Sequence, residues 1–384
     1  MYYLEFIYLM KRSISMKVFF LANIPSPYRV DFFNELGKYC DLTVFFERQN
    51  ALGREWSRKK DLNYKSIFLN GIKIGEDNSL CLDIIKYIKK DMFDIFIVGG
   101  YGTCTGMLAI QLLKIKKIKF ILNCDGGMKQ NCGYLKDLIK RYFISAATYY
   151  LSPASVTDNY LLEYGAKKEN IYRYSFTSLL EKEISKNLII DTEKNSLKNE
   201  LGIIEEKIII CVGRIIPLKG YSVLLKAVAR LRAKNVGIYI IGGPPTLELE
   251  KEIKNLDLSN VHFINFVNKD TLFKYYKCAN IFTFTTHGDV WGLVVNEAMA
   301  NGLPIISSDK AVAALQLVKE NVNGYIFNDN DHVQLAKYLK ILLEDEIKQK
   351  EFGINSLNII KNYSIENMAN EHISFFNKII RNEV

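Results

Sequence analysis

The sequence predicts an α/β fold in which each half of the chain forms its own parallel sheet. Short, continuous apolar strands recur in both halves, and each is followed by a loop and a helix. A polar stretch at residues 185–200, rich in Lys, Asn and Glu, lacks apolar periodicity and separates the halves. The length of 384 residues suits two or three domains. We therefore expect a first domain at residues 16–178, a linker region at 179–199 and a second domain at 200–363.

The first half opens with a strand that is apolar throughout, as expected for a strand buried on both faces. Strand, loop, helix and strand in succession imply a right-handed crossover, so the loops after these strands lie at the carboxyl edge of the sheet. Five loop residues there are candidate site residues: Pro27, Tyr28, Arg29, Gly100 and Asp125. Asp125 is either a polar group of the site or a helix cap or turn former. We predict strands at residues 17–22, 42–46, 95–98, 119–123, 148–151 and 170–174, and helices at 30–38, 80–90 and 107–115.

The second half repeats the pattern. We predict strands at residues 207–212, 238–241, 261–264, 280–284 and 325–327, with a further strand opening at Ile305. Helices are expected after Gly220 as far as residue 232, at 271–278 and 291–300, and in a C-terminal series at 332–343, 348–362 and 365–380.

Two carboxylates separated by seven residues, Asp289 and Glu297, mark the most informative stretch. They follow a buried strand and run into a helix, and eight positions are a little over two helical turns, so both can face one site. Backbone amides near Gly292 and Leu293 suit a phosphate, and ionised carboxylates accept hydrogen bonds from sugar hydroxyls. An acidic loop followed by a solvated helical Glu remains the alternative.

A second cluster, of cations, follows the strand at residues 207–212. Gly213 and Arg214 end that strand, and Lys219 stands at the mouth of the next helix. An Arg and a Lys in such a turn can grip a diphosphate. The sequence lacks both G-x-x-x-x-G-K-[ST] and G-x-G-x-x-G, so neither a P-loop nor a dinucleotide fingerprint is expected.

The net charge of +9 favours an anionic partner, such as nucleotide phosphates, an anionic membrane surface or nucleic acid, although a solubility surface is the alternative. Nucleic acid is disfavoured because the basic residues are dispersed and no known module occurs. Two basic clusters in the first half permit contact with an anionic membrane surface. They are Lys114, Lys116, Lys117 and Lys119, and Lys136, Lys140 and Arg141.

Seven scattered cysteines and four histidines show neither a disulfide framework nor metal-ligand spacing. Reduced thiols in a cytosol fit best, and we expect no metal.

No apolar run approaches the ~20 residues of a membrane span. Residues 1–15 are expected to be a dispensable leader or an over-extended start.

With these residues in view, the chain from Met16 onward resembles the retaining glycosyltransferases of family 4, which have the GT-B fold. Gly213-Arg214 with Lys219-Gly220 is similar to the phosphate-binding pair of that family, and the stretch from Asp289 to Glu297 is similar to its E-x7-E signature. The first half, with residues 24–29 and Asp125-Gly126-Gly127, resembles a subgroup that builds bacterial surface polysaccharides.

The resemblance implies two Rossmann-like domains whose parallel sheets face a central cleft. It implies an acceptor-binding first domain, on which the last helix, 364–384, packs back, and a second domain that binds a nucleotide diphosphate sugar. Arg214 and Lys219 would hold the diphosphate and stabilise the leaving group. Glu297 would bind the nucleotide ribose. Asp289, with the amides near Gly292 and Leu293, would hold the donor sugar and phosphate, and His287 and Trp291 would lie near it.

Two departures from the family pattern stand out. Asp289 is one methylene shorter than the Glu of the family. Prolines and Arg29 replace the Gly-Gly loop after the first strand. The family often has a His at the place that Cys124-Asp125 occupies here. Asp125 is therefore a catalytic candidate, together with Arg214, Lys219 and Asp289.

The resulting hypothesis is a metal-independent enzyme, without a cofactor, that moves a hexose to a glycan or lipid-linked glycan. It would be cytoplasmic or peripheral at the inner face of the cell membrane. The alternatives are a nucleotide-sugar epimerase of the same fold and a non-catalytic subunit that binds a nucleotide sugar.

Overall fold

The computed structural model describes residues 16–49, 61–75, 78–129, 133–231 and 235–383. The chain divides into two compact units, each built on its own sheet. Unit 1 contains the described residues up to Ser178 together with those from Ser364 onward, and unit 2 runs from Leu179 to Tyr363. The expected leader, residues 1–15, lies outside the described residues.

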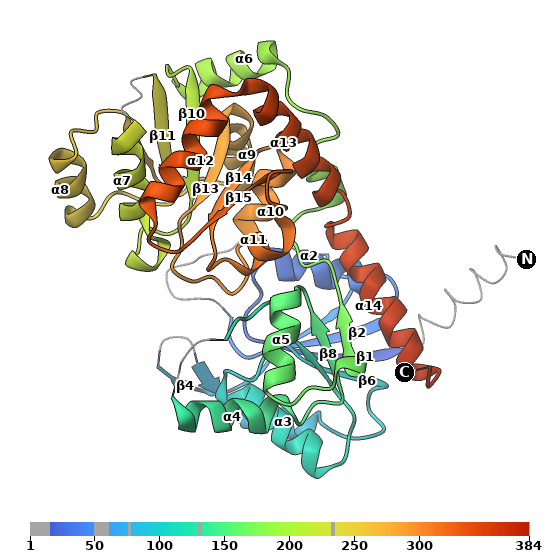
Figure 1. Cartoon of the computed structure of the whole chain (residues 1–384). Coiled ribbons are helices and arrows are strands. Elements are labelled where there is room, and N and C mark those ends of the chain that lie inside the picture. The colour runs from blue at the N-terminus through green and yellow to red at the C-terminus, as the bar shows by residue number, and fades with distance from the viewer. Residues whose placement is uncertain (1–15, 50–60, 76–77, 130–132, 232–234, 384) are drawn as a thin grey trace, which may run out of the picture. The chain divides into compact units, whose positions relative to one another are not determined.

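Unit 1 is organised around a parallel sheet of seven strands in the order β3-β2-β1-β6-β7-β8-β9 (Figure 1). Its strands are β1 (Lys17–Ala22), β2 (Asp41–Phe46), β3 (Lys65–Phe68), β6 (Ile95–Val98), β7 (Ile121–Asn123), β8 (Tyr149–Ser152) and β9 (Ile171–Arg173). The helices are α2 (Pro27–Leu36), α3 (Cys104–Ile115), α4 (Tyr134–Ile144), α5 (Ser155–Glu163) and α14 (Ile365–Ile380). A small antiparallel ribbon, β4 (Ile72–Ile74) with β5 (Asn78–Leu80), and the 3-10 turns η1 (Leu82–Lys86) and η2 (Lys168–Asn170) complete it.

Aromatic and aliphatic side chains fill the core of unit 1. Phe19 of β1 contacts Phe45 of β2 and Phe96 of β6, and helix α3 covers these rings with Ala109 and Leu113. Continuous apolar strands, such as β6 and the part of β1 after Lys17, are buried on both faces in this way. The last helix, α14, packs against α2, and its Glu371 accepts hydrogen bonds from the backbone and hydroxyl of Ser175.

Unit 2 has a parallel sheet of six strands in the order β12-β11-β10-β13-β14-β15. Its strands are β10 (Lys207–Val212), β11 (Val236–Ile241), β12 (Val261–Ile264), β13 (Ile281–Phe284), β14 (Ile305–Ser308) and β15 (Gly324–Phe327). The helices are α6 (Asp191–Leu201), α7 (Tyr221–Leu231), α8 (Leu247–Asn255), α9 (Lys269–Cys278), α10 (Leu293–Ala300), α11 (Val312–Leu317), α12 (His332–Glu344) and α13 (Glu346–Ile360), with η3 (Glu181–Glu183) and η4 (Pro217–Lys219). In both sheets β-strands alternate with helices, which is the doubly wound pattern of Rossmann-like domains.

Three predictions about local structure are wrong. The helix expected at residues 80–90 is only the short turn η1, because tertiary bonds hold the backbone on either side: the Cys81 amide donates to the Thr105 hydroxyl, and Lys116 donates to the Ile88 carbonyl. The polar stretch 185–200 contains helix α6, which buries none of its side chains fully and therefore shows no apolar period. Helix α10 begins at Leu293 and not at residue 291, because Gly292 has a left-handed backbone with φ of 104°.

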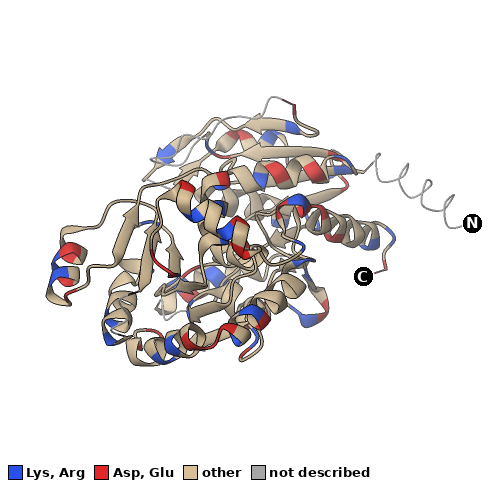
Figure 2. Ribbon diagram, turned by 90° about the horizontal axis from the view of Figure 1, so that it is seen from above, with Lys and Arg blue, Asp and Glu red and all other residues tan. Residues whose placement is uncertain are grey.

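Charged residues of both signs are interspersed on the helices that Figure 2 shows, so the net charge of +9 is not concentrated in one region of that view. Within the described residues, no helix is long and apolar enough to cross a bilayer.

Candidate active site

The candidate residues of unit 2 follow the carboxyl ends of three adjacent strands. Gly213 and Arg214 follow β10, Asp289 lies in the loop after β13, and Asp309 follows β14. Ligands of open α/β sheets bind at this edge, because loops from neighbouring strands converge there.

Lys219 and Asp289 form the central ion pair of this edge, although 70 residues separate them in sequence. The Lys219 Nζ lies 2.5 Å from Asp289 Oδ2, and the ammonium lies 5.0 Å from the centroid of the Phe284 ring. The Lys219 side chain is 13% exposed and that of Asp289 is 24% exposed, so both are largely withdrawn from water while the pair still borders solvent. The pairing fixes the position of the cation in the absence of a ligand.

Glycines make this close approach of the loops possible. Gly220 has φ of 65°, and a Cβ there would lie 2.1 Å from the Thr285 carbonyl oxygen. The hydroxyl of Thr285 donates to the Lys219 carbonyl at 3.0 Å, and that of Thr286 donates to the Leu218 carbonyl at 3.1 Å. The η4 turn is thus bonded directly to the loop that carries Asp289, and Gly213 lies beside it, because a Cβ on Gly213 would come within 3.7 Å of the Lys219 side chain.

Arg214 differs from Lys219 in having no partner. Its side chain is exposed, and within the described part of the chain its guanidinium forms neither a hydrogen bond nor an ion pair. A guanidinium presents N–H donors in a planar fork that matches two phosphate oxygens. Arg214 is therefore available to an anionic ligand at the same strand end that places Lys219.

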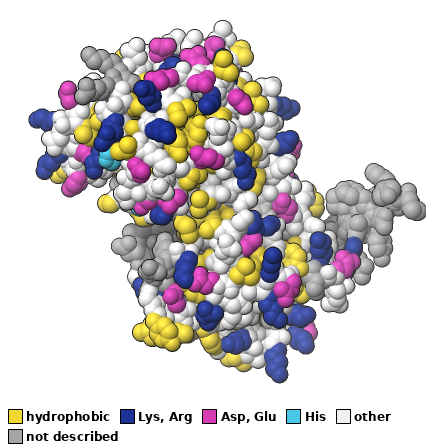
Figure 3. All heavy atoms as spheres, in the orientation of Figure 1, with side chains coloured by type: hydrophobic (Ala, Val, Ile, Leu, Met, Phe, Trp, Pro, Cys, Tyr) yellow, Lys and Arg dark blue, Asp and Glu magenta, His cyan; other side chains and the backbone are white. Residues whose placement is uncertain are grey.

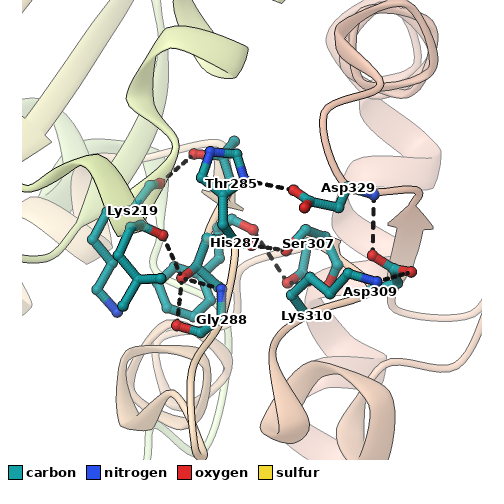
Figure 4. Close-up of polar contacts among 12 residues, drawn as sticks. Lys219, Thr285, His287, Gly288, Ser307, Asp309, Lys310 and Asp329 are labelled. Carbon is teal, nitrogen blue, oxygen red and sulfur yellow. Dashed lines mark hydrogen bonds and ion pairs between the residues drawn. The ribbon is translucent and has the colours of Figure 1, made fainter. Parts of the chain in front are cut away.

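His287 is held by an acidic residue from a neighbouring strand end. Its Nδ1 lies 2.6 Å from Oδ1 of Asp329, which follows β15, and its backbone N–H donates to the Leu218 carbonyl. Because a carboxylate accepts, Nδ1–H is the donor and Nε2 is the nitrogen left for a ligand. Figure 4 shows His287 and Asp329 facing each other, and Lys310 directed toward Asp309.

The amino end of α10 offers further donors. The Asp289 carboxylate accepts from the Trp291 amide at 3.2 Å, which ties the loop to the helix. The amides of Gly292, Leu293 and Val294 have no hydrogen-bond partner among the described residues. Amides at a helix start, with the helix dipole behind them, form an anion site. The left-handed φ of Gly292 allows this start, and a Cβ there would lie 2.9 Å from the Phe284 ring.

Trp291 and Glu297, two further candidates from the sequence, lie on the same segment but make different contacts. Trp291 is 3% exposed, and its indole N–H donates to Asn296 at 2.9 Å, so its ring anchors the loop in the core. Glu297 lies on α10 and accepts from the Tyr276 hydroxyl at 3.3 Å. Burial and then the Glu297 charge raise the pKa of Tyr276 well above its ordinary value, so Tyr276 stays a neutral donor that orients this carboxylate.

The candidates of unit 1 gather at the carboxyl edge of the first sheet. Arg29, in the first turn of α2, pairs with both carboxylate oxygens of Asp125, which follows β7. Asp125 also accepts from Tyr174 at 3.2 Å and from Asn123 at 3.0 Å. Burial by itself lowers the pKa of Arg29, but the Asp125 carboxylate outweighs it and raises that pKa above the ordinary value. The structure thus brings Arg29 and Asp125 together in a closed polar cluster.

The other unit 1 candidates, Pro27, Tyr28 and Gly100, have different surroundings. Tyr28 lies next to Arg29, and its ring contacts Phe176 edge-on. Pro27 is the first residue of α2, where its fixed φ suits a helix start. Gly100 borders open space, since a Cβ on it would meet nothing within 4 Å.

Sequence reasoning missed three polar residues of this region. Glu47 follows β2 and is 6% exposed; its Oε1 accepts from Thr103 at 2.7 Å, and its Oε2 has no hydrogen-bond partner among the described residues. Burial raises the pKa of Glu47 to about 7. Tyr174 and His372 also line the Arg29 cluster. An acidic residue directly after an apolar strand was the signal available for Glu47, the same signal that pointed to Asp125.

Within the described residues, no group of three or more His, Cys, Asp and Glu side chains is placed to hold a metal ion. The arrangement in unit 2 instead combines positive charge, from Arg214, Lys219 and the α10 amides, with the hydrogen-bond acceptors Asp289 and Glu297.

Comparison with known proteins shows what the chain is similar to. Residues 193–358 match the family model described as Glycosyl transferases group 1. An uncharacterized glycosyltransferase of Haemophilus influenzae is 32% identical over 197 residues, which cover 50% of this chain and 55% of that protein. The chain spans about half the length of the curated relatives that it matches.

Solved structures extend the likeness over nearly the whole chain. HepE from Anabaena, solved in complex with UDP, has a TM-score of 0.77 at 14% identity and covers 94% of this chain and 100% of its own. WaaG, a glycosyltransferase involved in lipopolysaccharide biosynthesis, has a TM-score of 0.68 at 14% identity and covers 94% and 99%. Together with the two Rossmann-like parallel sheets, these likenesses show that the chain has the GT-B fold.

Proposed function

We propose that this chain is a retaining glycosyltransferase of family 4. It transfers a hexose from a nucleotide diphosphate sugar to a glycan or lipid-linked glycan in the synthesis of a bacterial surface polysaccharide. The observation that carries the proposal is the charge arrangement at one strand edge of unit 2. Lys219 is held in place there, and the Arg214 side chain and the α10 amides have no partner within the part of the chain that the structure describes. The family match over residues 193–358, the UDP bound by HepE and the role of WaaG in lipopolysaccharide synthesis support it.

Each residue has a part in the reaction. Arg214 and Lys219 bind the diphosphate and stabilise the negative charge that grows on it as the bond to the sugar breaks. Preorganised cations are effective here because the Lys219–Asp289 pair is already set before the donor binds. Asp289 and the α10 amides hold the sugar and the phosphate, and Glu297, oriented by Tyr276, accepts hydrogen bonds from the ribose hydroxyls.

Retention follows from attack on the face that the nucleotide leaves. The acceptor oxygen forms the new bond to the anomeric carbon as the carbon–oxygen bond to the phosphate breaks, and the acceptor proton passes to the departing phosphate oxygen. This route requires no metal and no covalent enzyme intermediate. In unit 1, Arg29 and Asp125 shape the acceptor side as one ion pair, and Pro27, Tyr28 and Gly100 also belong to that side.

We place the reaction in the cytoplasm, at the inner face of the membrane when the acceptor is lipid-linked. All six cysteines that the structure describes are free thiols, which is the usual state in a reducing compartment.

Donor binding and transfer are tested in sequence. A thermal-shift screen of UDP, GDP, ADP and dTDP sugars identifies the donor, because a ligand that binds the folded state raises the melting temperature. Glu297→Ala is then expected to abolish transfer to a glycan acceptor, while its far-UV circular dichroism stays unchanged. Glu250→Ala, the same change on the exposed helix α8, is the control and retains activity.

Three results would contradict the proposal. Near-normal turnover of Glu297→Ala would remove the site assignment. Interconversion of a labelled nucleotide sugar without acceptor would indicate an epimerase. Tight donor binding without transfer or hydrolysis would indicate a non-catalytic binding subunit.

A further inference from the structure

Helix α4 of unit 1 is oriented with its apolar side outward. Of its eleven residues only Ile144 is fully buried, whereas five large apolar side chains are exposed. These five residues, which we call the α4 face, are Tyr134, Leu135, Leu138, Ile139 and Tyr142. A surface helix of a globular domain normally shows the opposite arrangement, with its apolar stripe against the core.

The spacing of the α4 face shows that it forms one continuous surface. At about 100° per residue, the five side chains fall within an arc of about 140° on the helix. The opposite side of the helix carries Asp137 and Lys140 and faces the domain: Asp137 accepts from the Tyr164 hydroxyl at 2.5 Å, and the Lys140 ammonium lies 5.4 Å from the Tyr164 ring centroid. The polar residues of α4 therefore hold the helix on the domain and leave the apolar ones to the outside.

Cations border the α4 face on both sides. Lys136 and Arg141 are exposed and lie just beyond the two ends of the apolar arc. The end of α3 adjoins it, because the Tyr142 hydroxyl donates to Gln111 at 2.7 Å and the Lys114 ammonium lies 3.9 Å from the Tyr142 ring centroid. That end adds exposed Ile115 and the exposed lysines of the first basic cluster. Figure 3 shows hydrophobic side chains gathered over α4, with Lys and Arg nearby.

We propose that the α4 face docks on an anionic membrane surface, with its apolar side chains entering the lipid interface and the bordering cations contacting the headgroups. An apolar arc flanked by Lys and Arg is the arrangement of helices that lie in the plane of such an interface. The charge argues for this occupant over a second copy of the chain, because two such faces would bring their own cations together. A lipid-linked acceptor of the proposed sugar transfer would lie in that membrane.

Vesicle sedimentation with the full chain tests this inference. Vesicles of phosphatidylcholine with and without phosphatidylglycerol are used at low and high salt. We expect the wild type to bind the anionic vesicles and to lose that binding with salt, because exposed charges are screened. Leu135→Gln/Ile139→Gln is expected to weaken binding by roughly tenfold or more, since two apolar side chains no longer enter the interface. Lys136→Gln/Arg141→Gln is expected to weaken it by roughly fivefold for each cation removed.

Matched controls come from unit 2. Ile347 and Ile354 on α13 are 82% and 50% exposed, against 74% and 48% for Leu135 and Ile139, so Ile347→Gln/Ile354→Gln removes the same kind of surface. Lys251→Gln/Lys254→Gln on α8 removes two exposed cations. Both control variants should bind as the wild type does.

Several outcomes would overturn the inference. One is that the wild-type protein does not bind anionic vesicles at low salt. Another is that it binds uncharged vesicles equally well. A third is that the test and control variants lose equal amounts of vesicle binding. A dimer in sedimentation velocity that Leu135→Gln/Ile139→Gln dissociates would assign the α4 face to a second copy instead. Binding is measured without donor sugar, so its failure is distinguishable from a failure of the proposed transfer reaction.

Discussion

The two sheets place cations at equivalent edges, but they use them differently. In unit 1, Arg29 is 7% exposed, pairs with Asp125 and is surrounded by the rings of Phe20, Phe33 and Phe176. In unit 2, Lys219 is paired at a solvent-facing edge, and Arg214 at the same edge is exposed and has no side-chain partner among the described residues. The comparison indicates that the cation of unit 1 stabilises its own domain through a buried ion pair, whereas unit 2 presents positive charge that an anionic ligand can bind.

The largest expected effect comes from removing each arginine in turn. Arg29→Met leaves Asp125 without its cation in a mostly buried cluster, and a broken buried pair costs about 3–5 kcal/mol of unfolding free energy. Arg214→Met changes an exposed side chain and should alter that free energy by less than about 0.5 kcal/mol. Urea denaturation followed by circular dichroism measures both. Equal losses in the two variants would show that the two edges do not differ as described.

For turnover we expect the opposite order, with the larger loss at Arg214 and the smaller at Arg29. Arg214→Gln removes a preformed donor to the diphosphate and should lower turnover by roughly 10²–10³-fold, or about 2.7–4 kcal/mol. Lys219→Gln should fall in the same range and also free Asp289. The control is Arg230→Gln, a change on α7 away from this strand edge. Turnover of Arg214→Gln within about threefold of the wild type would mean that this guanidinium does not contact the diphosphate.

Much of the fold could be predicted from the sequence because most positions of its parallel strands are apolar. The strands predicted at residues 17–22, 95–98, 207–212 and 261–264 have those bounds in the structure. Helix α6 was missed for the opposite reason: none of its own side chains is fully buried where it packs against α9, so its sequence carries no apolar period.

The candidate site was only partly accessible to sequence reasoning. Strand ends and spacing identified Lys219 and Asp289 as polar groups of one edge, but not that they pair with each other, because that depends on how two distant loops approach at Gly220. Pairing of Arg29 with Asp125 could not be foreseen either, since 96 residues separate them. The basic residues around α4 were visible in the sequence, but the outward orientation of its apolar side depends on Asp137 and Lys140 facing the domain.

Glu47 provides a further test of the difference between the two edges, with the smallest expected effect. Asp289 forms an ion pair with Lys219, whereas Glu47 is buried and, among the described residues, its Oε2 has no hydrogen-bond partner. Burial raises the pKa of Glu47 from 4.5 to about 7. Below pH 4.5 both the folded and the unfolded chain hold the proton. Between about pH 4.5 and 7 only the unfolded chain releases it, so the wild type loses stability as the pH rises, by at most about 3 kcal/mol above pH 7.

Glu47→Gln removes this titration and keeps a neutral side chain of similar shape. The variant should therefore match the wild type near pH 4.5 and exceed it in unfolding free energy by about 1–3 kcal/mol at pH 8. Urea denaturation at pH 4.5, 6 and 8 measures the difference, and Glu250→Gln on exposed α8 should show none at any of these pH values. A difference that stays constant with pH would mean that the Glu47 carboxyl is already ionised in the folded protein, and the contrast between a committed edge in unit 1 and an open one in unit 2 would then rest on Arg29 and Asp125 alone.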